Sequence, residues 1–162
     1  MRYNLGMKNE NNQLYELLLL KNQLCFPTYA AANKIIRRYQ PLLKELDLTY
    51  TQYVVMMVMW EKEIVNEKDL VEALYLQANT LAPLLKKLTQ KGYIDICKDK
   101  KDKRNIVITL TDVGRALKDK AVNVPLSLAE EPWLTIEEAK VYRRLLYKII
   151  NEGNELKDED CD

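Results

Sequence analysis

Apolar residues recur at spacings of three and four through residues 11–46, and this periodicity predicts helix interrupted by two prolines. Proline fits the first turn of a helix, where its missing N–H would be unpaired anyway, so we expect Pro27 to open a long helix. Thr49 and Gln52 form a capping-box pattern ahead of the apolar run 53–61. That run predicts a helix buried at the centre of the fold.

Two shorter helical segments follow, at about 67–74 and 79–90, joined by a short turn. We expect Asn79 or Thr80 to cap the second segment and Gly92 to close it. Two short helices joined in this way are typical of a helix-turn-helix unit.

The spacing then changes to that of β-strands. Residues 93–97 and 106–110 are rich in β-branched side chains, and the stretch 98–105 between them is polar. These residues predict a β-hairpin with a basic tip. Thr111 and Thr135 each precede a further helical pattern.

The last two helices are predicted to be joined by a loop that contains Pro125 and Pro132. The whole order predicts a mainly α fold with a small β-hairpin, in one domain spanning residues 1–162. We expect a winged helix-turn-helix DNA-binding region at 49–110, flanked by dimerisation helices at 11–46 and 112–155. Terminal helices with long apolar stripes need a partner, so we expect a homodimer.

Composition excludes several classes of protein. No apolar run reaches the roughly 18 residues that a membrane span needs, and the start of the chain lacks a signal-peptide pattern, so we expect a cytoplasmic protein that does not act on membranes. The chain has no histidine and three cysteines without CxxC spacing. We therefore expect no metal, no cofactor and no enzymatic activity. The net charge is only +1, so a nucleic-acid role requires local clustering of cations.

The second helix of the predicted helix-turn-helix unit shows such clustering. Short polar groups near its start suit base edges, and longer cations further along suit phosphates. The candidate DNA-binding residues are Gln77, Asn79, Thr80, Lys86 and Lys87. An ordinary amphipathic helix with a solvated basic side explains the same pattern.

The hairpin tip strengthens the DNA-binding hypothesis. Five of the seven residues from Lys98 to Arg104 are cations. A lone charge run is usually a solvated loop, but a basic tip just after a helix-turn-helix unit favours entry into a minor groove. Lys101 and Arg104 are candidate contacts, and Asp102 would orient the Arg104 guanidinium.

Cys25 is the candidate reactive thiol. A helix amino terminus provides a positive dipole end that favours the thiolate, which is the form that attacks a peroxide. Tyr29 and Tyr39 follow at four and fourteen residues on the same helical stripe. Fourteen residues span about 21 Å, so Tyr39 can approach only the Cys25 of a partner subunit in an antiparallel dimer. Two alternatives stay open: Cys25 as a small core residue, and the tyrosine stripe as interface packing.

Several linked motifs resemble the MarR family of bacterial winged-helix regulators, and within it the organic hydroperoxide resistance regulators, over about residues 14–125. The resemblance is carried by Asn22-Gln23-Leu24-Cys25-Phe26, Tyr29-Ala30-Ala31, Tyr39-Gln40-Pro41-Leu42-Leu43, Leu48-Thr49-Tyr50-Thr51-Gln52-Tyr53, Leu74-Tyr75-Leu76, Thr80-Leu81-Ala82-Pro83-Leu84-Leu85-Lys86 and Asp102-Lys103-Arg104.

This resemblance implies a repressor that binds a double-stranded, pseudo-palindromic operator and releases it when an organic hydroperoxide oxidises Cys25. It implies that Tyr29, Tyr39 and Tyr50 surround the thiol across the subunit boundary, and we place Phe26 in the same pocket. It also implies that Arg104, with Asp102, reads the minor groove.

The resemblance leaves the fate of the oxidised thiol to this chain's own cysteines. Residues 126–131, where two-cysteine relatives carry a resolving cysteine, contain none. We therefore expect a low-molecular-weight thiol to cap the sulfenic acid. Three other functions remain: a repressor relieved by a non-covalent phenolic or apolar ligand, a thiol peroxidase, and a winged helix that binds proteins.

Overall fold

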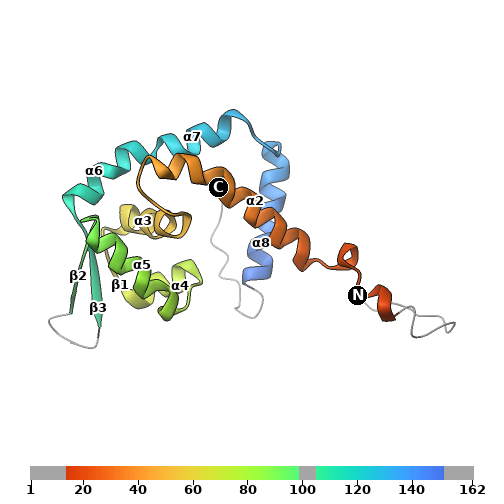
Figure 1. Cartoon of the computed structure of the whole chain (residues 1–162), viewed down its shortest axis with the longest axis horizontal. Coiled ribbons are helices and arrows are strands. Elements are labelled where there is room, and N and C mark those ends of the chain that lie inside the picture. The colour runs from red at the N-terminus through yellow and green to blue at the C-terminus, as the bar shows by residue number, and fades with distance from the viewer. Residues whose placement is uncertain (1–13, 99–104, 152–162) are drawn as a thin grey trace. The chain divides into compact units, whose positions relative to one another are not determined.

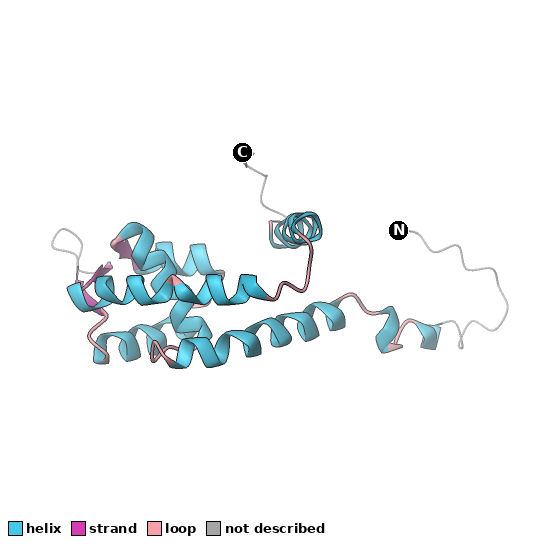
Figure 2. Ribbon diagram, turned by 90° about the horizontal axis from the view of Figure 1, so that it is seen from above, coloured by secondary structure: helices cyan, strands magenta, loops and turns pink. Residues whose placement is uncertain are grey.

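The structure is a computed structural model that describes residues 14–98 and 105–151. The chain divides between Val124 and Pro125 into two compact units, each described by itself below. Figure 1 labels the elements along the chain, and Figure 2 distinguishes helices from strands. The assignment of the terminal helices to one dimerisation region stays a prediction.

The fold is mainly α with a small antiparallel sheet, as predicted. In the described ranges no helix is long and apolar enough to cross a membrane. The elements are η1 Leu20–Asn22, α2 Cys25–Lys44, α3 Tyr50–Lys62, β1 Ile64–Asn66, α4 Glu67–Leu74, α5 Ala78–Gln90, β2 Ile94–Lys98, β3 Ile106–Leu110, α6 Asp112–Ala121, α7 Asn123–Glu130 and α8 Ile136–Ile150.

Local signals in the sequence fix where α2 and α3 begin. Cys25 is the first residue of α2 and Pro27 the third, so the predicted position of Pro27 in the first turn is confirmed. The capping box of Thr49 and Gln52 that opens α3 is also confirmed. Helix α3 forms the centre of the core, because its Met56 and Met59 side chains are completely buried.

The predicted cap of α5 is wrong. The helix begins at Ala78, so Gln77 is the N-cap residue, and its side chain makes no capping hydrogen bond. Asn79 and Thr80 lie inside the first turn instead, where the Thr80 hydroxyl donates to the Asn79 side-chain oxygen over 3.4 Å. The predicted end of the helix is confirmed, because Gly92 adopts a positive φ of 72° directly after the last turn.

The hairpin of β2 and β3 is confirmed, and a third strand joins it. The sheet order is β1-β3-β2, with Val65 and Ile96 both opposite Ile108 in the central strand. The sequence pattern did not reveal β1, since a strand of three residues between two helices has no periodicity to detect. Its single buried residue, Val65, packs into the core.

The helices after the sheet begin as expected, with one correction. Thr111 caps α6 by accepting from the Gly114 N–H over 3.0 Å, and Thr135 opens α8 with a complete capping box. Pro132 lies in the loop before α8, as predicted. Pro125 does not lie in a loop, because it is the third residue of α7, where the first helical turn needs no N–H from it.

A close approach at Gly114 joins three parts of the first unit. The Trp60 indole N–H of α3 donates to the Gly114 carbonyl of α6 over 2.8 Å in a buried contact. A β-carbon added at Gly114 would overlap the Tyr93 carbonyl and lie 2.9 Å from a methyl carbon of Leu110. Only glycine therefore allows α6 to pack this closely on the chain that leads into the sheet.

We predict that Gly114→Ala lowers the free energy of unfolding by about 3 kcal/mol, because backbone must shift to relieve the overlap. Urea unfolding followed by circular dichroism measures the loss. Asp119→Ala, at an exposed position of the same helix, is the control and should change the value by less than about 0.5 kcal/mol. Equal stability of the two variants would contradict the packing argument.

Candidate functional site

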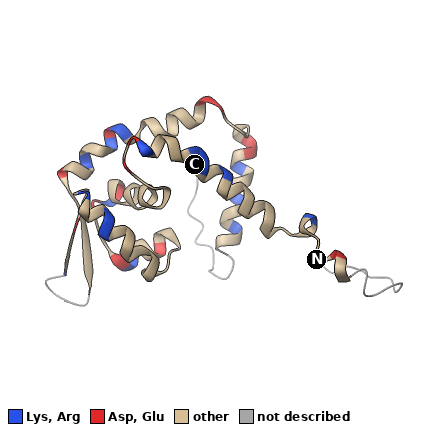
Figure 3. Cartoon of the chain, in the orientation of Figure 1, with Lys and Arg blue, Asp and Glu red and all other residues tan. Residues whose placement is uncertain are grey.

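Helix α5 presents the predicted DNA-binding face. Leu81, Leu85 and Leu88 are buried and hold the helix on the core. The opposite side carries the polar and basic candidates, and Figure 3 marks the charged positions along the helix. All five candidates are exposed: Gln77, Asn79, Thr80, Lys86 and Lys87. The amino end of α5 therefore offers short polar groups at an exposed positive helix terminus, and two exposed cations follow them along the helix.

The wing is the hairpin of β2 and β3, and its strand β2 contacts this helix. Strand β2 ends at Lys98, which is exposed. Three of the predicted DNA contacts at the tip, Lys101, Asp102 and Arg104, lie outside the described residues.

Cys25 lies at the amino end of α2 with its side chain exposed. The adjacent Phe26 is 42% exposed and Tyr29, one turn on, is 68% exposed. The thiol is therefore not part of the core of a single chain. The structure instead gives it an apolar, aromatic neighbourhood that is open on the chain's own surface.

The other two predicted pocket tyrosines lie in the second half of α2, which holds Tyr39, and at the start of α3, which begins with Tyr50. The Tyr39 ring meets the Tyr50 ring edge-on, with centroids 5.2 Å apart, and lies 6.1 Å from the Tyr53 ring. The structure thus brings the side chains of Tyr39 and Tyr50 into contact. It adds Tyr53, one turn after Tyr50, which the sequence analysis missed although the three-residue spacing could have indicated it.

Burial raises the pKa of two tyrosines in this cluster. Desolvation raises the pKa of Tyr39, with a further contribution from Tyr50. Burial likewise raises the pKa of Tyr53. Both phenols therefore stay neutral at physiological pH and keep an O–H group that can donate a hydrogen bond.

Cys25 and Tyr39 do not meet within one chain. They are fourteen residues apart on the same helix, which corresponds to about 21 Å along its axis. A single site containing both would therefore need two subunits.

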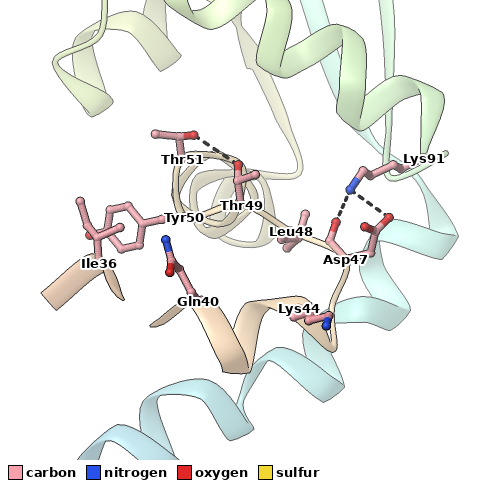
Figure 4. A pocket seen from close by; sticks show the side chains of 9 residues that line it. All are labelled: Ile36, Gln40, Lys44, Asp47, Leu48, Thr49, Tyr50, Thr51 and Lys91. Carbon is pink, nitrogen blue, oxygen red and sulfur yellow. Dashed lines mark hydrogen bonds and ion pairs between the residues drawn. The ribbon is translucent and has the colours of Figure 1, made fainter. Parts of the chain in front are cut away.

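A cavity of about 550 Å³ lies beside the tyrosine cluster. Figure 4 shows its lining, where Ile36, Gln40 and Tyr50 face one another and Lys91 approaches Asp47 at the other end. Of the predicted site residues within the described ranges, Tyr50 alone lines it. No group of three or more His, Cys, Asp or Glu side chains that could hold a metal ion occurs within residues 14–98 and 105–151.

Known proteins match both the sequence and the fold. The family described as "Transcriptional regulator SarA/Rot" matches residues 37–121. The organic hydroperoxide resistance transcriptional regulator of Bacillus subtilis is 36% identical over 136 residues, which are 84% of this chain and 92% of that protein. The HTH-type transcriptional regulator SarZ of Staphylococcus aureus is 41% identical over 120 residues, 74% of this chain and 81% of SarZ.

Solved structures of AbfR from Staphylococcus epidermidis are also similar. Reduced AbfR bound to DNA has a TM-score of 0.73 and 31% identity, covering 88% of this chain and 99% of AbfR. Overoxidised AbfR bound to DNA has a TM-score of 0.72 and 31% identity, covering 86% and 98%. A disulfide form has a TM-score of 0.62 and 29% identity, covering 90% and 100%. The chain therefore belongs to the MarR family of winged helix-turn-helix transcriptional regulators, in the group of the organic hydroperoxide resistance regulators.

Proposed function

We propose that this regulator is a homodimeric repressor that binds a pseudo-palindromic DNA operator and releases it when an organic hydroperoxide oxidises Cys25. The observation that carries the proposal is the position of Cys25, exposed at the first residue of a 20-residue helix in a chain related to hydroperoxide regulators. The reaction requires a thiol that the peroxide can reach, and the exposed Cys25 side chain offers one.

The DNA-binding part of the proposal rests on α5 and the wing. Helix α5 has an exposed polar and basic face above a buried leucine face. AbfR, of similar fold, has been solved bound to DNA in its reduced form. In a dimer, two such helices would enter successive major grooves of a two-fold related operator.

A second copy of the chain would cover apolar surface that is exposed in both units. In the first unit Leu18 is 78% exposed and Leu24 74% exposed. In the second unit Ile136 is 76% exposed, and Leu145 is 49% exposed. Exposed apolar side chains gathered in this way normally pack against other protein, and a symmetric dimer would supply that partner.

The dimer would also complete the peroxide site. Tyr39 and Tyr50 lie too far from Cys25 of their own chain, so they would act on the partner's thiol, beside Phe26 and Tyr29 of that partner. The phenol hydroxyls would donate hydrogen bonds to the thiolate and to the bound peroxide. Their rings would form an apolar wall suited to an organic hydroperoxide rather than to hydrogen peroxide.

The chemistry is a two-electron oxidation of sulfur. The Cys25 thiolate attacks the outer peroxide oxygen, the O–O bond breaks, and the alkoxide takes a proton and leaves as an alcohol. Cys25 is left as a sulfenic acid. A low-molecular-weight thiol then displaces hydroxide from this sulfur, forming a mixed disulfide and water.

A non-covalent ligand is the second candidate trigger. The cavity beside Tyr50 is large enough for a small organic molecule and has both apolar and polar walls, from Ile36 and Gln40 respectively. Its occupation by such a ligand would relieve repression without any change at Cys25.

The test is operator affinity before and after one equivalent of an organic hydroperoxide. We predict that oxidation weakens operator binding of the wild type by about tenfold or more, within the usual range of allosteric coupling. Cys25→Ser should bind the operator and ignore the peroxide. Cys97→Ser, which removes the other exposed thiol within the described residues, is the matched control and should respond as the wild type does.

Each contrary result points elsewhere. Retained release by Cys25→Ser would favour the non-covalent trigger. Continuous consumption of hydroperoxide with a reductant, in a chain without operator affinity, would indicate a thiol peroxidase. A protein disulfide in place of the mixed disulfide would overturn the one-cysteine chemistry and match the disulfide form known for AbfR.

The wing gives a separate prediction. Arg104→Ala should lower operator affinity by about 1–3 kcal/mol, the usual value of one arginine contact in a groove. Lys120→Ala, an equal loss of charge on the exposed side of α6, should change the affinity by less than about 0.5 kcal/mol. Titration of labelled operator by fluorescence anisotropy measures the affinity of both variants. Equal losses would mean that the wing contributes only its positive charge and that Arg104 makes no specific groove contact.

A further inference from the structure

The three residues that follow α5, Lys91 to Tyr93, form a junction segment that leads into β2. Lys91 makes an ion pair with the Asp47 carboxylate, Nζ to Oδ2 2.9 Å, and also donates to the Asp47 carbonyl. The Tyr93 hydroxyl donates to the neighbouring Leu46 carbonyl over 3.3 Å. Figure 4 shows the two contacts of Lys91. The junction segment thus holds two successive carbonyls of the loop that joins α2 to α3.

The same segment controls both DNA-reading elements. It ends α5 on one side and enters β2 of the wing at Ile94 on the other. The Thr111 hydroxyl donates to the Gly92 carbonyl over 2.6 Å, and the Thr111 N–H donates to the Tyr93 carbonyl over 3.2 Å. A displacement of the junction segment therefore reaches α5, the wing and the start of α6 together.

The loop on the other side of the contact is rigidly attached to α2. Asp47 has a positive φ of 52°, and the Leu48 N–H donates back to the Leu43 carbonyl over 3.0 Å, which closes the end of α2 in a Schellman motif. Leu43, Leu46 and Leu48 are all buried. The end of α2 and the loop are therefore held together both by the backbone turn and by buried side chains.

The pair of Lys91 and Asp47 is poorly placed to act as a stabilising contact. The Asp47 side chain is 77% exposed and that of Lys91 is 24% exposed, and ion pairs this open to water contribute little to stability. Its geometry has a different consequence. It is a polar tie between the helix that begins with Cys25 and the end of the helix that carries the DNA-binding face.

We infer that Lys91 and Asp47 are positioning residues that transmit the state of Cys25 to the DNA-binding face. This inference rests on the proposed function and adds the path, meaning the series of contacts, by which oxidation of Cys25 reaches the DNA-binding face. Oxidation and capping of Cys25 shift α2, the rigid loop carries the shift to Asp47, and Lys91 passes it into the junction segment. Helix α5 and the wing then move together out of the position that fits the operator.

Two variants with opposite charge changes test the path. Asp47→Asn keeps a residue that tolerates a positive φ and keeps the carbonyl, but loses the carboxylate. Lys91→Gln loses the cation. Each is expected to reduce the peroxide-induced fall in operator affinity about threefold or more relative to the wild type. Trapping of the sulfenic acid by dimedone and mass spectrometry should show the same yield at Cys25 in all three proteins.

Glu63→Gln is the matched control. Glu63 also ends a helix with a positive φ of 60°. Its carboxylate also pairs across elements, with Arg115 of α6, but it follows the end of α3 that is opposite to the loop joining α2 to α3. This variant should release the operator on oxidation as the wild type does.

The outcomes separate the path from the proposed function. A wild type that releases DNA, with both variants releasing it equally, overturns the path alone. Opposite effects of Asp47→Asn and Lys91→Gln would mean that only net charge matters, and would also overturn it. A wild type that is oxidised at Cys25 and keeps the operator refutes the proposed function, and the path with it.

Discussion

The close contact of Gly114 with the Tyr93 carbonyl is the constraint on which the rest of the first unit depends. It lets α6 lie directly against the chain that leaves α5, while the Trp60 indole of α3 donates to the Gly114 carbonyl. Helices α3 and α6, the residue that precedes β2 and the last residue of β3 are thereby fixed around one point. A recognition helix and a wing can read DNA together only if their spacing is rigid, and this packing provides that rigidity.

The geometry of α2 is the reason why the proposed sensor would need two subunits. A single long helix carries Cys25 at its first residue and Tyr39 fourteen residues later, where the aromatic cluster with Tyr50 and Tyr53 begins. The thiol end lies on the chain's surface, whereas the aromatic end packs on the core next to the junction segment. The proposed sensor, formed by the thiol of one chain and the tyrosines of another, would be anchored in both subunits, so a chemical change at one sulfur would act on the interface itself.

Sequence alone predicted the features that short-range chemistry controls. Capping residues such as Thr49, Thr111 and Thr135 define helix starts within a few residues, and the β-branched runs define the hairpin. The same reasoning placed Tyr39 out of reach of its own Cys25. It failed where distant residues decide. Strand β1 exists because β3 pairs with it, and α5 begins at Ala78 although its N-cap residue, Gln77, makes no capping hydrogen bond that a local pattern could signal. The contact of Lys91 with Asp47 joins residues 44 positions apart, which no local pattern reveals.

The central claim is that the oxidation state of Cys25 determines operator binding. Its most direct test is to titrate the operator-bound protein with an organic hydroperoxide and to measure, on the same samples, the fraction of Cys25 oxidised by intact-protein mass spectrometry and the fraction of DNA released by fluorescence anisotropy. The account predicts that the two fractions rise together and that a thiol reductant returns both to zero. Full oxidation of Cys25 with the operator still bound would contradict it.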